Sequence, residues 1–153
     1  MAWSASKVFA HTILLSLTST QFDLVADTVN VALYNNSITP DNTVSTSALT
    51  EYNGSGSQWL TANEVYQAGQ WAQGGVALGS QTWTQSGNVD TFTGANTSSG
   101  SAATLANVYG CLVYDSTVSS IGLSFNYFGG VQSVSDGALT VVWNASGIFT
   151  FTT

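Results

Sequence analysis

The sequence predicts a mainly β protein, an antiparallel sandwich or barrel-like single domain with a short helix or arm at its N-terminus. Three observations predict this fold. Short apolar runs recur along the chain with Gly, Asn, Asp or Pro between them, which is the pattern of strands and turns. The chain has 153 residues, the size of one domain. Its hydrophobic fraction of 44% is enough to build a core.

The N-terminal segment, residues 1–20, is predicted to be an arm or helix that precedes a β-rich domain over residues 21–153. Residues 4–20 carry a broad apolar face, which favours a helix. Ser and Thr are dense in the second half of this segment, so a strand over residues 11–17 stays an alternative. The apolar run over residues 8–17 resembles a secretion signal but lacks a basic region, and it is too short to span a membrane.

Strands are predicted over much of the remaining chain. Residues 28–34 alternate between apolar and polar side chains, which predicts a half-buried strand. Residues 105–115 are almost continuously apolar, so we expect both faces of that strand to be covered. Further short strands are predicted at residues 76–84, 89–93, 121–128, 131–134, 139–143 and 148–152.

Turn and loop signals separate these strands. Gly129-Gly130 predicts a hairpin turn. Residues 41–75 are polar and irregular, with one expected helical turn at residues 61–67, where Thr61 and Glu64 have the spacing of a capping box. Residues 94–103 are rich in Gly, Ser, Ala and Thr and are expected to form a loop.

The charge composition excludes two classes of partner. Only 6% of residues are charged, compared with about 25% in ordinary soluble domains. Lys7 is the single basic side chain and the formal net charge is −7. Nucleic-acid binding requires several Lys or Arg side chains to neutralise phosphates, and anionic membranes attract clusters of the same residues. We therefore expect no nucleic-acid partner and no membrane partner.

The side chains that carry most enzyme chemistry are scarce. His11 is the only histidine and lies in an apolar run, where a structural role is expected. Cys111 is the only cysteine and lies in the most apolar strand, so we expect a buried, unreactive thiol. Residues 41–42 and 88–90 offer carboxylate and amide oxygens, but neither has the spacing of a calcium loop. The sequence predicts no enzyme, no cofactor and no metal.

Two tryptophans in the irregular region are candidates for stacking on a sugar or on a protein partner. These are Trp59 and Trp71, which lie close in sequence to the only glutamates, Glu51 and Glu64. A pair of carboxylates beside aromatic rings is the arrangement of glycoside hydrolases, and aromatic rings alone suffice for sugar binding. The alternative is that both tryptophans fill the core or an interface.

Two stretches resemble a known group of proteins. The first reads FDL at residues 22–24 and DTVNVALY at residues 27–34, followed by ITPD at residues 38–41. The second reads VYD at residues 113–115, with the ending VWNASGIF at residues 142–149. This order is similar to that of small virion structural proteins of tailed bacteriophages, of the capsid decoration or minor capsid type. The resemblance covers both ends of the chain but not its middle.

The resemblance implies a β-rich module on the capsid surface of a virion, with the major capsid protein and copies of itself as partners, as a trimer or other cluster. The candidate docking arm is the start of the chain, with Trp3, Lys7 and Phe9. An exposed Trp is a favoured interface anchor, although Trp3 could instead fold back on its own core. A tail or fibre module and a carbohydrate-binding module remain alternatives.

Overall fold

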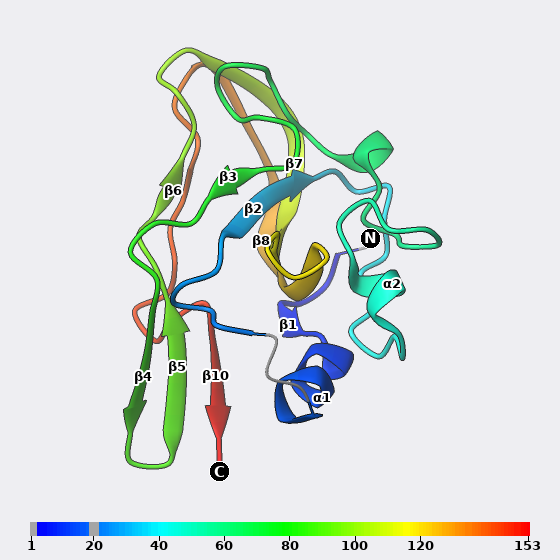
Figure 1. The fold of residues 1–153 in the computed structure, drawn as a ribbon. Helices are drawn as coiled ribbons and strands as arrows, with labels where there is room; N and C mark the ends of the chain where they lie inside the picture. Colours follow the sequence, from blue (N-terminus) through cyan, green and yellow to red (C-terminus); the bar gives the residue numbers. More distant parts are fainter. Residues whose placement is uncertain (1–2, 19–21) are drawn as a thin grey trace.

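The computed structural model describes residues 3–18 and 22–153. Strands contain 43% of the residues and helices 11%, and every strand pair is antiparallel. The prediction of a mainly β, antiparallel, sandwich-like domain is therefore confirmed (Figure 1). The elements are β1 (Lys7–Val8), α1 (Ala10–Thr18), β2 (Val29–Tyr34), α2 (Ser47–Thr50), a 3-10 helix (Thr61–Asn63), β3 (Val76–Ala77), β4 (Thr82–Ser86), β5 (Val89–Thr93), β6 (Thr97–Ser98), β7 (Ala103–Asp115), β8 (Ile121–Gly137), β9 (Thr140–Val141) and β10 (Phe149–Thr152).

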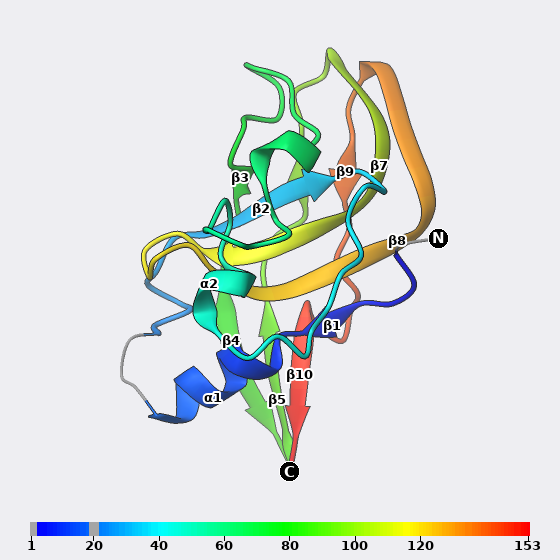
Figure 2. The same ribbon diagram turned by 90° about the vertical axis from the view of Figure 1, so that its right-hand side faces the viewer.

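The strands form three sheets. The largest has the order β1-β8-β7-β2-β3, and a three-stranded sheet has the order β10-β5-β4. The short strands β6 and β9 pair separately. In Figures 1 and 2 the three-stranded sheet extends away from the large sheet, and α1 lies on one side of it. Helix α1 and strands β4 and β10, which are far apart in sequence, line a common cavity.

The large sheet is covered on both faces. Val29, Val31 and Leu33 of β2 point to one hydrophobic cluster, and Ala32 and Tyr34 point to another. This alternation confirms the predicted orientation of the strand, but the strand is buried on both sides rather than half-buried. The partner strand β7 divides in the same way, which confirms that both of its faces are covered.

The N-terminal segment combines a strand with a helix. Residues 4–9 are not helical, since Lys7 and Val8 pair with Phe125 and Ser124 of β8. The helix begins at Ala10 and ends at Thr18, so the predicted helix is confirmed over that part and the alternative strand over residues 11–17 is wrong. The end of the predicted arm, residues 19–20, lies outside the described residues.

The predicted hairpin at Gly129-Gly130 is wrong. β8 continues through both glycines from Ile121 to Gly137 and pairs with β7 along its length. The register shifts between the pairs Val108–Gln132 and Gly110–Tyr127, where β8 contains more residues than β7. Gly129 has a φ of +78°, so the glycine pair serves a bulge in a long strand, a role that the dipeptide also permits.

Several local predictions for the middle of the chain are also corrected. The expected strand over residues 76–84 is two short strands, β3 and β4, because the chain breaks where Ser80 adopts a φ of +52°. Residues 47–50 form an unpredicted helical turn. The 3-10 helix begins after Leu60 without a side-chain cap, so Thr61 and Glu64 do not form a capping box.

Candidate functional site

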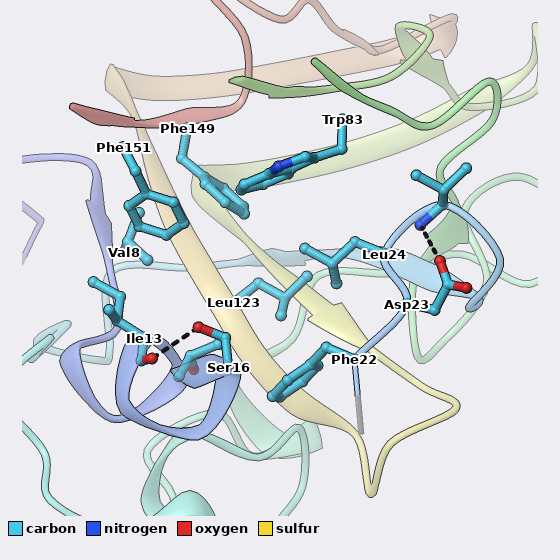
Figure 3. Close-up of a pocket in the computed structure, with 12 residues that line it drawn as sticks. Val8, Ile13, Ser16, Phe22, Asp23, Leu24, Trp83, Leu123, Phe149 and Phe151 are labelled. Carbon is cyan, nitrogen blue, oxygen red and sulfur yellow. Dashed lines mark hydrogen bonds between the residues drawn. The ribbon is translucent and has the colours of Figure 1, made fainter. Parts of the chain in front are cut away.

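The candidate site is a cavity of about 330 Å³ between α1 and the three-stranded sheet, which we call the apolar groove. Figure 3 shows Trp83, Phe149 and Phe151 on one side, Ile13 and Ser16 opposite them, and Leu123 between. Its size falls within the range of ligand-binding pockets. The lining residues are Val8, Thr12, Ile13, Ser16, Phe22, Asp23, Leu24, Val25, Trp83, Leu123, Phe149 and Phe151.

One wall of the apolar groove is an aromatic row that crosses the three-stranded sheet. Trp83 of β4 is opposite Phe92 of β5, and Phe92 is opposite Phe149 of β10, so the three rings share one face of the sheet. The ring centroids of Phe92 and Phe149 are 5.1 Å apart, and those of Trp83 and Phe149 are 5.9 Å apart. Cross-strand aromatic pairs stabilise sheets, so this row makes a firm wall.

Phe151 extends the aromatic wall because β10 reads Phe-Thr-Phe-Thr. In a strand, residues two apart point to the same face, which puts Phe149 and Phe151 on the groove side. Their ring centroids are 5.7 Å apart, and Phe151 is 5.7 Å from Trp83. Phe92, in the middle of the row, is fully buried, whereas Trp83 at its edge is 38% exposed. The wall is therefore anchored in the core and open at its outer edge.

The opposite wall is helix α1, which uses little of its apolar surface within the domain. Thr12 is the only buried residue among its described side chains, and its hydroxyl donates to the carbonyl of Gly122. Ile13 is half-buried and lines the apolar groove. Leu14 and Leu17 are 54% and 80% exposed. A helix with exposed leucines beside an apolar cavity is a feature of interaction surfaces.

The third wall is the turn that follows α1 in sequence and precedes β2. Phe22 and Leu24 point toward the cavity (Figure 3). The carboxylate of Asp23 accepts hydrogen bonds from the backbone N–H groups of Val25 and Ala26, at 3.3 and 3.2 Å, and this closes the turn. Val25 at the tip of the turn is 55% exposed.

The polar side chains of the lining are engaged with the protein itself. Ser16 donates to the carbonyl of Ile13 at 2.8 Å, Thr12 donates to Gly122, and Asp23 accepts from its own turn. Among the described residues of the lining, Asp23 is the only charged one. These residues are suited to burying an apolar group and include no paired acid and base. The resulting candidate site binds by hydrophobic contact.

Two of the three residues proposed for docking lie in the core and not on the surface, which corrects that prediction. Trp3 and Phe9 are fully buried in one hydrophobic cluster, and the indole nitrogen of Trp3 donates to the carbonyl of Asn35 at 2.9 Å. The alternative that Trp3 folds back on its own core is therefore the observed arrangement. Lys7 is exposed, but its neighbour Val8 is the residue of β1 that lines the apolar groove.

The tryptophans proposed for sugar or partner stacking are also core residues. Trp59 and Trp71 are both fully buried, in the clusters on opposite faces of the large sheet. Trp71 donates to the carbonyl of Val31 at 3.1 Å, whereas the buried Nε1 of Trp59 has no hydrogen-bond partner among the described residues. Neither ring presents a face for stacking, so the interpretation that they fill the core replaces the binding role.

The remaining candidate side chains have structural positions. Cys111 is buried, as predicted, and burial raises the pKa of its thiol to about 12. Glu64 is buried and accepts hydrogen bonds, so it is not available as a solvent-facing acid. Among residues 3–18 and 22–153, no group of three His, Cys, Asp or Glu side chains is placed to hold a metal ion. No helix in the same residues has the length and hydrophobicity needed to cross a bilayer.

The apolar groove was not found from the sequence because its walls come from segments far apart in the chain. The alternation of Phe149 and Phe151, together with Trp83, was the available signal. Comparison with known proteins gives no matching family model, no matching curated protein and no matching solved structure.

Proposed function

We propose that this protein is a non-enzymatic structural module of a virion that docks on the capsid shell and stabilises or decorates it. The observation that carries the proposal is the apolar groove, whose rim exposes large hydrophobic side chains. These are Val25 and Trp83 of the lining, and helix α1, which forms the opposite wall, also exposes Leu14 and Leu17. Soluble monomers rarely expose such side chains together, and a contiguous apolar patch marks a contact with another molecule.

The occupant that fits the apolar groove best is an apolar segment of another protein subunit. The described part of its lining has one charged residue, Asp23, and that carboxylate accepts hydrogen bonds within its own turn. Recognition by shape and apolar contact suits a permanent assembly, in which large hydrophobic surfaces stay covered. The low charge of the chain adds little repulsion between neighbouring copies on a shell.

The sequence resemblance gives the proposal its virion context, because composition and geometry alone support only a docking module. The major capsid protein and further copies of this chain are the expected partners. The two tryptophans on which the carbohydrate-binding alternative depended, Trp59 and Trp71, are fully buried and cannot stack on a sugar. A tail or fibre module would use the same apolar groove on a different partner.

Locating the chain on the source virion by electron microscopy tests this proposal. The purified protein, carrying a gold label, is added to shells from which the chain has been removed. Label or density at regular positions on the head supports the capsid role. Label confined to the tail, or binding to neither part of the particle, contradicts it.

Binding to soluble cell-wall glycans gives the discriminating control. A carbohydrate-binding module changes its tryptophan fluorescence on adding glycan, and the 38% exposed Trp83 and the half-buried Trp143 are the rings that would respond. A saturable change with glycan and none with capsid shells would replace the capsid proposal by the carbohydrate one.

A further inference from the structure

Asp115 is a fully buried carboxylate at the end of β7. Its Oδ1 accepts hydrogen bonds from the backbone N–H groups of Thr117 and Val118, at 2.8 and 3.1 Å. Its Oδ2 is buried and has no hydrogen-bond donor among the described residues. Burying a carboxylate oxygen without a hydrogen-bond donor costs free energy of folding. The protonation state of Asp115 therefore needs a physical explanation.

Asp27 is the titratable group that faces Asp115. It lies in the turn before β2, where its Oδ2 accepts from the backbone N–H of Asp23 at 2.8 Å. Its carboxylate interacts with Asp115 both as a nearby charge and as a hydrogen-bond partner. The strand residues paired with Asp115 on either side, Val29 and Ile121, carry no ionisable group.

The two turns that carry these carboxylates are already connected through the backbone. The N–H of Thr28 donates to Oγ1 of Thr117 at 2.9 Å, and the carbonyl of Thr28 accepts from the N–H of Ser116 at 2.9 Å. These bonds hold the turn that carries Asp27 against the turn that follows Asp115. The turn with Asp27 also contains Phe22 to Val25, which form a wall of the apolar groove.

Two carboxylates in contact cannot both be ionised without repulsion, and one bound positive charge relieves it. A proton needs no coordination space, whereas Ca²⁺ takes six to eight oxygen ligands. No three metal-binding side chains converge in the described part of the chain. Burial first, and then the charge of Asp27, raise the pKa of Asp115 to about 6. A proton fits this pair better than a metal ion does.

We propose that Asp27 and Asp115 share one proton, which latches the turn before β2 to the turn after β7 and holds that wall of the apolar groove in place. The protonated oxygen of one carboxyl donates to the other carboxylate. On ionisation the proton passes to solvent, and the two negative charges then face each other. The inference concerns the wall of the groove and does not depend on what binds there.

The sign of the pH dependence follows from the raised pKa of Asp115. The folded protein holds a proton that the unfolded chain releases near the ordinary Asp value, so the stabilisation is complete at about pH 4 and is lost as pH rises through about 6. This difference of about two pKa units corresponds to a change of roughly 100-fold in the folding equilibrium constant.

The test is urea unfolding between pH 4 and 8 in a Glu64→Gln background, because burial also raises the pKa of Glu64. The parent is expected to lose stability as pH rises through about 6. Asp115→Asn keeps the acceptor Oδ1 and gives Asp27 a permanent amide donor, so its pH step should disappear. Asp27→Asn should reduce the same step, because the burial of Asp115 remains, and Asp136→Asn, at an exposed residue of β8, should keep it whole.

Carbon-13 NMR of the aspartate carboxyls provides a readout that does not depend on the variants. The carboxyl of Asp115 is expected to titrate with a pKa near 6. Titration of Asp115 near the ordinary Asp value would overturn the proposal. So would stabilisation of the parent by millimolar Ca²⁺ at pH 7.5 that Asp27→Asn abolishes, because the pair would then hold a metal ion.

Discussion

Tyr52 donates a 2.7 Å hydrogen bond from its hydroxyl to Oε2 of the buried Glu64. The other carboxylate oxygen of Glu64 accepts from the backbone N–H of Gly74 at 2.7 Å. The Tyr52 ring stacks on Tyr114 with a centroid distance of 4.9 Å, and the Tyr114 hydroxyl donates to the carbonyl of Gly74. These contacts close a polar network that holds the irregular middle of the chain against the large sheet.

Removing the Tyr52 hydroxyl should weaken this network. Tyr52→Phe leaves Oε2 of Glu64 without that donor, and a lost hydrogen bond to a buried carboxylate costs about 1–3 kcal/mol in free energy of unfolding. The same change should raise the pKa of Glu64 further, because this hydrogen bond lowers it. Urea unfolding at pH 7 measures the loss. Tyr66→Phe, at a 46% exposed ring, is the matched control and should leave stability unchanged.

Trp3 should behave as a core residue rather than as a docking anchor. Its ring contacts Trp59 and Phe125 edge-on, at centroid distances of 5.8 and 6.1 Å. Trp3→Ala is expected to cost about 3–5 kcal/mol in free energy of unfolding, the usual range for a buried tryptophan. Leu17→Ala removes an 80% exposed side chain and should cost little. Thermal unfolding compares the two, and equal stability of both variants would contradict the buried position of Trp3.

A charge at the rim of the apolar groove should prevent docking without unfolding the protein. Val25→Glu puts a carboxylate on the turn before β2 that forms one wall of the apolar groove. Because burying that charge against an apolar partner is unfavourable, binding to capsid shells should weaken by about tenfold or more. Val131→Glu is the matched control, since Val131 is 50% exposed and lies outside the groove lining, compared with 55% for Val25. Co-sedimentation with shells measures both, and equal binding would exclude the groove as the docking surface.

The thiol of Cys111 should be unreactive in the folded protein. It is fully buried and its pKa is raised to about 12, so neither access nor ionisation favours attack on a disulfide reagent. Reaction with a chromogenic disulfide should be slow in native buffer and complete at once in urea. A fast native reaction would show that β7 opens without global unfolding, which the burial on both of its faces argues against.

The strands in the middle of the fold could be predicted from the sequence because their own side chains determine them. The alternation in β2 and the apolar run in β7 give their faces directly. The role of Gly129-Gly130 could not be predicted, because a hairpin turn and a bulge use the same residues and only pairing with β7 decides between them. Sequence likewise cannot distinguish an exposed Trp3 from a buried one, since the partners that cover it lie more than fifty residues away in the chain.

The candidate site was missed for a related reason. Val8, Leu24, Trp83 and Phe151 become neighbours only after the sheets have formed. The proximity of Asp27 to Asp115 could not be predicted from the sequence either. It depends on two turns that are brought together by the register of β2 with β7. Local patterns therefore predicted the elements of this fold, whereas its long-range pairings created the groove and the carboxyl pair.

The pairing of β1 with β8 has a consequence for how the chain is made. Lys7 is opposite Phe125, and Thr12 donates to the carbonyl of Gly122, so the first elements find their partners near the end of the sequence. During synthesis, solvent therefore reaches β1, α1 and Trp3 until β8 has been made and can cover them. Contacts of such long sequence separation close late and slowly. The segment with β1 and α1 should therefore complete its packing only after β8 has been synthesised, and until then it is a segment that a chaperone would shield.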